Sequence, residues 1–127
     1  MATGHPDYQT WTGKAIGGKG VNAYSFSGEI DGESSGYVPL DAVPTGVQHS
    51  YVQIAISCPD DTAIHTVWLQ RVSDDWIFFS AGFITSGVFD LVADPQAAGA
   101  EIRIYITNNS ASTLTFTGTI SWIIREI

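Results

Sequence analysis

The most regular stretch of this chain is Thr113-Leu-Thr-Phe-Thr-Gly-Thr-Ile-Ser-Trp-Ile-Ile124, near the C-terminus. Every second residue from Thr113 to Ser121 carries a small hydroxyl group, and the residues between are apolar or glycine. Because successive side chains of a strand point to opposite faces, the alternation predicts a β-strand with one buried face. The residues expected to face the core are Leu114, Phe116, Ile120 and Trp122, with Gly118 leaving room or marking a bulge.

The opposite face of this strand is a ladder of hydroxyl side chains. Its members are Thr113, Thr115, Thr117, Thr119 and Ser121. They are polar but uncharged, so another chain can approach them without the desolvation cost of Lys or Glu. We interpret the ladder as a packing face, although plain exposure to solvent fits the pattern equally well. It holds no catalytic group.

The rest of the chain repeats this strand signal in shorter runs. Val47–Cys58 alternates, with Val52, Ile54 and Ile56 expected on one face and Tyr51, Gln53 and Ala55 on the other. Trp76–Phe79 is a compact apolar run, typical of a strand buried on both faces. Together with Ile64–Val72 and Ala100–Thr107, the pattern indicates about seven to nine short strands and no helix. We therefore predict an all-β fold, a single antiparallel β-sandwich of jelly-roll-like type, over residues 22–127.

Composition and charge narrow the classes of partner. The chain has 127 residues, a length that suits one domain, and only 14% of them are charged. Its net charge is −8, and no cluster of Lys or Arg is present to neutralise phosphates. Nucleic acid and anionic membranes are therefore not expected as partners. The first residues lack the apolar core of a signal peptide, and no apolar run is long enough for a membrane span, which favours folding in a cytoplasm.

Residues 1–21 form a glycine-rich segment with a distinct charge. Two lysines and one aspartate give this segment a net charge of +1. Since the whole chain carries −8, residues 22–127 carry −9. We predict an extended N-terminal arm that orders against a neighbouring subunit, and a flexible tail is the alternative. The expected contact residues are Tyr8, Trp11 and Ile16 as apolar anchors, with Lys14 and Lys19 facing acidic surface on the neighbour.

No catalytic or metal-binding signature stands out. His5, His49 and His65 lie in separate segments, and the single Cys58 is expected to be a small buried side chain. Two acidic pairs, Asp60-Asp61 and Asp74-Asp75, flank the run Ile64–Val72 and are weak candidates for calcium ligands. Asp31-Gly-Glu33 is a third loop of this kind. Because Asp favours turns for structural reasons, we predict no cofactor.

The four tryptophans raise a second class of function. Aromatic rings on the face of a sandwich can stack on pyranose rings of a carbohydrate. Trp68, Trp76 and Trp122 each neighbour Ile, Val or Leu, which favours contact with the core or with another subunit. Trp11 lies in the arm, where an anchor in a neighbour's pocket would suit it.

The order of turns and strands resembles a loose group of small β-sandwich structural proteins of tailed phages and prophages. The likeness covers about residues 43–125, with a vaguer echo in His5–Tyr8. It is carried by the following pieces: the turn Val43–Gly46 leading into Tyr51–Cys58, the strand Leu69–Arg71, the hairpin Phe79–Phe83, Asp94-Pro followed by Gly-Ala-Glu-Ile-Arg-Ile104, Ile106-Thr-Asn-Asn-Ser110, and Phe116-Thr-Gly-Thr-Ile120. The resemblance implies a virion component, such as a capsid decoration, fibre-base or tail-associated subunit, made in the host cytoplasm.

The sequence thus predicts a non-enzymatic structural subunit that works by self-association and arm exchange. Its expected partners are other copies of itself and other virion proteins. The alternative is a carbohydrate- or receptor-binding sandwich module, with or without calcium. A small enzyme on the same fold is the weakest hypothesis, because no acid, base and nucleophile converge.

Overall fold

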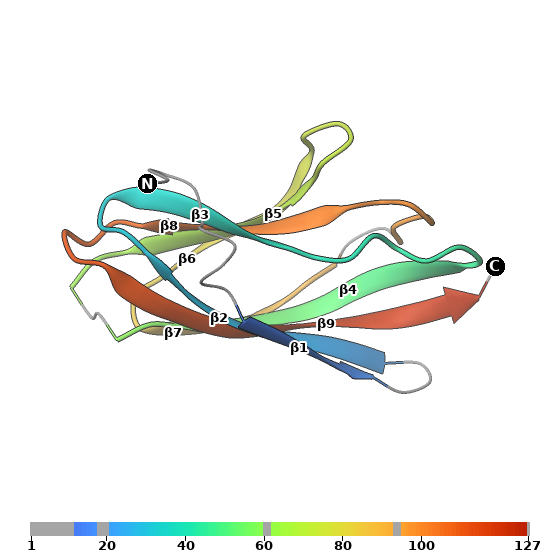
Figure 1. The fold of residues 1–127 in the computed structure, drawn as a ribbon, viewed down its shortest axis with the longest axis horizontal. Coiled ribbons are helices and arrows are strands. Elements are labelled where there is room, and N and C mark those ends of the chain that lie inside the picture. Colours follow the sequence, from blue (N-terminus) through green and yellow to red (C-terminus); the bar gives the residue numbers. More distant parts are fainter. Residues whose placement is uncertain (1–11, 18–20, 60–61, 93–94, 127) are drawn as a thin grey trace.

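A computed structural model describes residues 12–17, 21–59, 62–92 and 95–126 of the chain as a β-sandwich (Figure 1). The strands are β1 (Thr12–Gly17), β2 (Val21–Ile30), β3 (Ser34–Pro39), β4 (Val47–Ser57), β5 (His65–Arg71), β6 (Ile77–Phe83), β7 (Ser86–Asp90), β8 (Ile102–Asn108) and β9 (Leu114–Glu126). The prediction of an all-β sandwich is confirmed. In the described ranges there is no helix long and apolar enough to cross a membrane.

Two antiparallel sheets form the layers of the sandwich. One has five strands in the order β1-β2-β9-β4-β7, and the other has four in the order β3-β8-β5-β6. The predicted ladder strand is β9, the longest strand, and it pairs with β2 on one side and β4 on the other. The alternating stretch Thr113–Ile124 therefore lies at the centre of the larger sheet.

The inner face of β9 holds the core as expected. Leu114, Phe116 and Ile120 are buried, and Trp122 packs half-buried against the same cluster. Gly118 leaves room for a ring: a Cβ there would lie 2.6 Å from the Phe26 ring and 2.5 Å from the backbone oxygen of Ala55. The pairing of Gly118 with Phe26 and Ile56 is regular, so β9 has no bulge at this point.

The bulge lies instead in β4, and it corrects one prediction. The register of β4 against β9 shifts between Tyr51 and Gln53. Tyr51 is 2% exposed and lies in the core with Ile54 and Ile56, whereas Val52 is only half-buried. The expected grouping of Val52 with Ile54 was wrong, because one extra residue reverses the alternation before the bulge.

The run Trp76–Phe79 is also not buried on both faces. Its strand, β6, is the edge of the four-stranded sheet, beside β5 only. Trp76 is 43% exposed and Ile77 is 49% exposed, while Phe78 and Phe79 are half-buried. The sequence prediction was wrong because a continuous apolar run does not reveal whether a second strand covers it.

Part of the predicted arm is described as a strand of the same chain. Residues 12–17 form β1, which pairs with β2 from Thr12 opposite Ser27 to Gly17 opposite Asn22. This strand includes Lys14 and Ile16. Tyr8, Trp11 and Lys19 lie outside the described residues, so their contacts with a neighbour stay a prediction.

We predict that Gly118→Ala lowers the free energy of unfolding by about 1–3 kcal/mol, the usual cost of overpacking a core. The added methyl group meets the Ala55 backbone oxygen, which cannot move aside as a side-chain tip does. Urea unfolding measures the change. Thr115→Val, on the outer face of the same strand, is the matched control, and equal stability of both variants would contradict the packing described.

Candidate assembly surface

The outer face of the five-stranded sheet is built from small side chains in register. Thr119 lies opposite Ser25 on β2 and Ala55 on β4, and Ala55 lies opposite Val88 on β7. The neighbouring row joins Ser27, Thr117, Ser57 and Ser86 in the same way. Across β2, β9, β4 and β7, these two rows contain no charged residue. The predicted hydroxyl ladder is thus the middle of an uncharged area on four strands, and the row through Ser25 continues to Lys14 on β1.

Several hydroxyl groups on this face bind one another. Ser25 Oγ and Thr119 Oγ1 share a hydrogen bond of 3.0 Å, and Ser57 Oγ and Thr117 Oγ1 share one of 2.9 Å. These bonds run sideways between strands, so part of the hydrogen-bonding capacity is satisfied within the sheet. Covering such a face costs less than covering groups that depend on water alone.

Exposure varies along the ladder. Thr115 and Thr117 are exposed, whereas Thr119 and Ser121 are half-buried. Thr113 is exposed just before β9, and its hydroxyl donates to Asp31 Oδ1 at 3.3 Å. Val88 contributes an apolar side chain that is 66% exposed.

A shallow hollow of about 470 Å³ lies on this face. Its small side chains come from β2, β4, β7 and β9: Ser25, Ala55, Ser57, Ser86, Thr117 and Thr119. Charged residues lie at the margins, where Glu29 is opposite Thr115 and Asp90 accepts from Gln53 Nε2 at 3.2 Å. The hollow can therefore accept a surface of matching shape at a low desolvation cost, and its lining contains no acid, base or thiol group.

Sequence reasoning found the ladder on β9 but missed its neighbours on other strands. Ser25, Ser57 and Val88 belong to the face because of strand pairing, which the sequence does not specify. Residues 22–30 do contain a signal that could have indicated a hydroxyl row on a second strand, because Ser25 and Ser27 alternate with Tyr24, Phe26 and Gly28.

The outer face of the four-stranded sheet is different in chemistry. Tyr37, Tyr105 and Trp68 form one row across β3, β8 and β5. The rings of Trp68 and Tyr105 stack with centroids 5.1 Å apart, and the Arg103 guanidinium lies 4.2 Å from the centre of the Tyr37 ring. Trp68 is therefore a half-buried surface residue whose ring packs on Tyr105.

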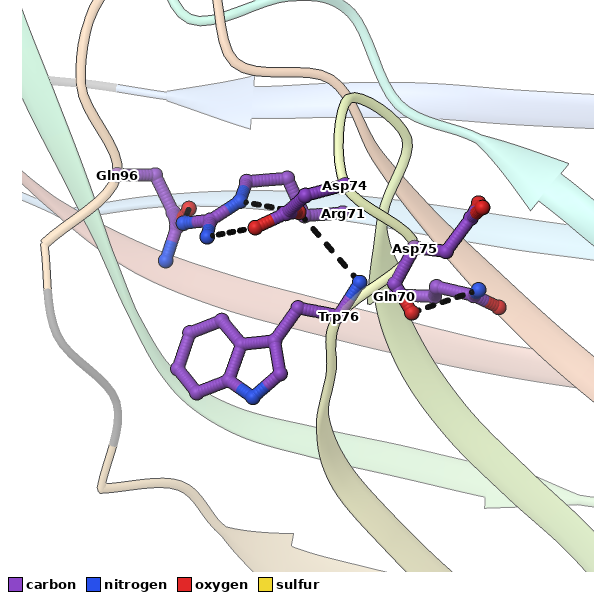
Figure 2. Close-up of polar contacts among 6 residues, drawn as sticks. All are labelled: Gln70, Arg71, Asp74, Asp75, Trp76 and Gln96. Carbon is purple, nitrogen blue, oxygen red and sulfur yellow. Dashed lines mark hydrogen bonds and ion pairs between the residues drawn. The ribbon is translucent and has the colours of Figure 1, made fainter.

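The loop between β5 and β6 holds one of the predicted calcium pairs (Figure 2). Arg71 Nε donates to Asp74 Oδ1 at 2.9 Å, and Arg71 Nη2 donates to Asp74 Oδ2 at 2.5 Å. The hydrogen bond from Arg71 holds the pKa of Asp74 below its ordinary value. The same guanidinium lies 5.0 Å from the Trp76 ring, and its Nη1 donates to Gln96 Oε1 at 3.3 Å.

This geometry gives the two aspartates structural roles. The carboxylate of Asp74 is engaged by Arg71, and Asp75 adopts a positive φ of 57° while its backbone oxygen accepts from Gln70 Nε2. Figure 2 shows the Asp75 carboxylate directed away from Asp74. Asp60 and Asp61 lie outside the described residues. Among the residues that are described, no three His, Cys, Asp or Glu side chains are grouped to hold a metal ion.

The cysteine and two histidines are interior residues. Cys58 is buried as predicted, and its Sγ donates to the backbone oxygen of Ile84 at 3.3 Å. His65 is buried between the sheets, and its Nδ1 accepts from the backbone of Asn109 at 3.2 Å. His49 stacks on Trp122 with ring centroids 5.3 Å apart. His5 lies outside the described residues.

Neither a protein-family model nor a curated protein matches the sequence. Solved structures share the fold. PirA is 16% identical with a TM-score of 0.54, covering 76% of this chain and 92% of its own. A chain of the cyanophage Pam1 capsid asymmetric unit is 15% identical with a TM-score of 0.54, covering 88% and 91%. The Yersinia pseudotuberculosis-derived mitogen is 16% identical with a TM-score of 0.52, covering 78% and 84%. At these identities the similarity shows the fold alone.

We predict that Arg71→Gln raises the pKa of the Asp74 carboxyl group toward its ordinary value, because the guanidinium that favours the charged form is lost. In the wild type, the contribution of the Arg71–Asp74 pair to folding stability is fully present above the ordinary pKa of aspartate. It is lost as the pH falls through the lowered value. NMR titration of the carboxyl carbon measures the shift, with Arg103→Gln as the control. An unchanged titration of Asp74 in Arg71→Gln would refute the assignment.

Proposed function

We propose that this chain is a non-enzymatic structural subunit of a phage virion that self-associates through the outer face of its five-stranded sheet. The observation that carries the proposal is the uncharged centre of that face, where hydroxyl groups are hydrogen-bonded sideways and Val88 is exposed. The presence of the same fold in the cyanophage Pam1 capsid supports the location in a virion.

The charge of the body explains why such a face is needed. With −8 overall, two copies repel each other, and a contact lined with carboxylates would increase the cost. A face whose central rows lack charge on four strands avoids both like-charge contact and the burial of unpaired ions. Acidic residues at its margin, such as Glu29 and Asp90, remain in water when the centre is covered.

The N-terminal segment supplies the second part of the proposal. Strand β1 pairs with β2 of its own chain at the edge of the sheet. The same register can form with β2 of a neighbouring copy, which is the geometry of strand exchange. In that arrangement Tyr8, Trp11 and Ile16 anchor the arm on the neighbour, and Lys14 and Lys19 bring positive charge to its acidic body.

Thr117→Glu tests the packing face. A carboxylate in the central row adds like charge and an unpaired ion to the contact, so we expect self-association to weaken about tenfold or more. Sedimentation velocity over a range of concentrations measures the effect. Ser80→Glu adds the same charge at an exposed position of β6, on the other sheet, and should leave association unchanged. Equal behaviour of the two variants would exclude this face as the contact.

Removal of residues 1–20 tests the arm. We expect a folded protein, because the buried core cluster of the described side chains begins at Phe26, but one with weaker association. Removal of residues 1–11 alone deletes Tyr8 and Trp11 while keeping β1, and so separates anchoring from strand exchange. A sedimentation profile that neither truncation alters would show that the arm has no part in assembly.

A further inference from the structure

A cavity lies between the inner face of the five-stranded sheet and the connection that follows β3. Its volume is about 260 Å³. The walls come from the start of β2, the first half of β4, the end of β9 and residues 39–44. The side chains that decide its chemistry are Asn22, Tyr24, Asp41, His49, Tyr51 and Trp122. This volume is below the range of about 300–1,000 Å³ of sites for drug-sized ligands, and it suits a single small ring.

Three side chains of the cavity carry buried nitrogen atoms that need partners. Within the described part of the chain, Asn22 Nδ2, His49 Nε2 and Trp122 Nε1 have no hydrogen bond. An unsatisfied buried polar atom costs about 1–3 kcal/mol, so native structures retain few of them. Three such atoms around one cavity form a set of polar groups whose hydrogen bonds water or a small polar ligand in the cavity can complete.

The backbone holds these groups in fixed positions. Asn22, Trp122 and Tyr51 lie side by side in one row across β2, β9 and β4. His49 is held by two backbone bonds to Gln96, His49 N to Gln96 O at 3.1 Å and Gln96 N to His49 O at 2.8 Å. The Trp122 ring stacks on His49 and meets Tyr51 edge-on with centroids 5.8 Å apart. Such a preformed aromatic wall loses little conformational entropy when a ligand binds.

The charges at the cavity limit what it can accept. Its lining includes one carboxylate, Asp41, and no Lys or Arg. Burial lowers the pKa of His49, so its imidazole is neutral at pH 7. Burial, together with the nearby charge of Asp41, raises the pKa of Tyr24, so its phenol stays protonated. An anionic ligand would be repelled by Asp41 and would find no cation.

A cation or a hydrocarbon fits no better. The Trp122 indole N–H and the Asn22 amide NH₂ can only donate, so a ligand must present acceptor atoms to them. A hydrocarbon would leave all three nitrogens unsatisfied, and a cationic ligand would place donors against donors. The carboxylate of the exposed Asp41, in contrast, is an acceptor and can bind a donor of the ligand. A neutral ring bearing several hydroxyl groups meets both needs, because each hydroxyl donates and accepts.

We propose that this cavity binds one neutral hexopyranose ring, such as a terminal sugar of a glycan. Trp122 and Asn22 donate to ring hydroxyl oxygens, Asp41 accepts from a ring hydroxyl, and the apolar face of the ring packs on the aromatic wall. The site lies on the inner side of the sheet whose outer face we assign to assembly. Sugar binding and self-association are therefore independent proposals, and a test that refutes one leaves the other untouched.

The test uses the full-length protein labelled with ¹⁵N and titrated singly with D-glucose, D-galactose, D-mannose and N-acetyl-D-glucosamine. We expect at least one sugar to shift the Trp122 indole and Asn22 amide signals, with a Kd of about 1–10 mM. Asp41→Ala, at an exposed loop position, should weaken binding about tenfold, since it removes a charged acceptor. Trp122→Phe keeps an aromatic ring, loses the N–H and should weaken binding about 3–10-fold.

Trp68→Phe on the other sheet is the matched control and should leave the Kd unchanged. No shift at Trp122 with any of the four sugars, or equal affinity in Asp41→Ala and the wild type, would overturn the proposal. A Trp122 signal that moves with protein concentration but not with sugar would also overturn it, in favour of a segment of a second copy in the cavity.

Discussion

The structure depends on the two-residue period of β9. This strand lies in the middle of the larger sheet, paired along its length with β2 and β4, so its two faces define two surfaces at once. Phe116 and Ile120 fix the inner layer of the sandwich, and the hydroxyl residues between them fix the outer one. A shift of the register by one residue would exchange the two sets, burying hydroxyls and exposing rings, and this penalty specifies the pairing.

The same constraint explains the glycine in the middle of the strand. Phe26 needs space on the inner face, and Gly118 provides it without interrupting the ladder on the outer face. Further along the strand the inner layer changes character, from aliphatic and phenyl side chains to Asn22, His49 and Trp122 around a cavity. One sheet thus carries an apolar core, an outer surface whose central rows on β2, β9, β4 and β7 are uncharged, and a polar cavity.

The sequence predicted the parts of this arrangement that are local. The alternation in β9 and the buried state of Cys58 follow from neighbouring residues. The bulge at Tyr51 was not predictable, because apolar side chains at positions 51, 52 and 54 fit either phase of the strand. The exposure of Trp76 depends on β6 being an edge strand, which is a property of the sheet order. The cavity combines residues from four separate segments, so no spacing in the sequence marks it.

We propose that this acidic protein packs against other copies of itself through the uncharged central rows of its five-stranded sheet. The most direct test is the molar mass in solution, measured by light scattering from about 1 μM to about 1 mM protein. We expect a mass above the 13.6 kDa of the single chain, rising with concentration. A constant mass of 13.6 kDa over the whole range would contradict it.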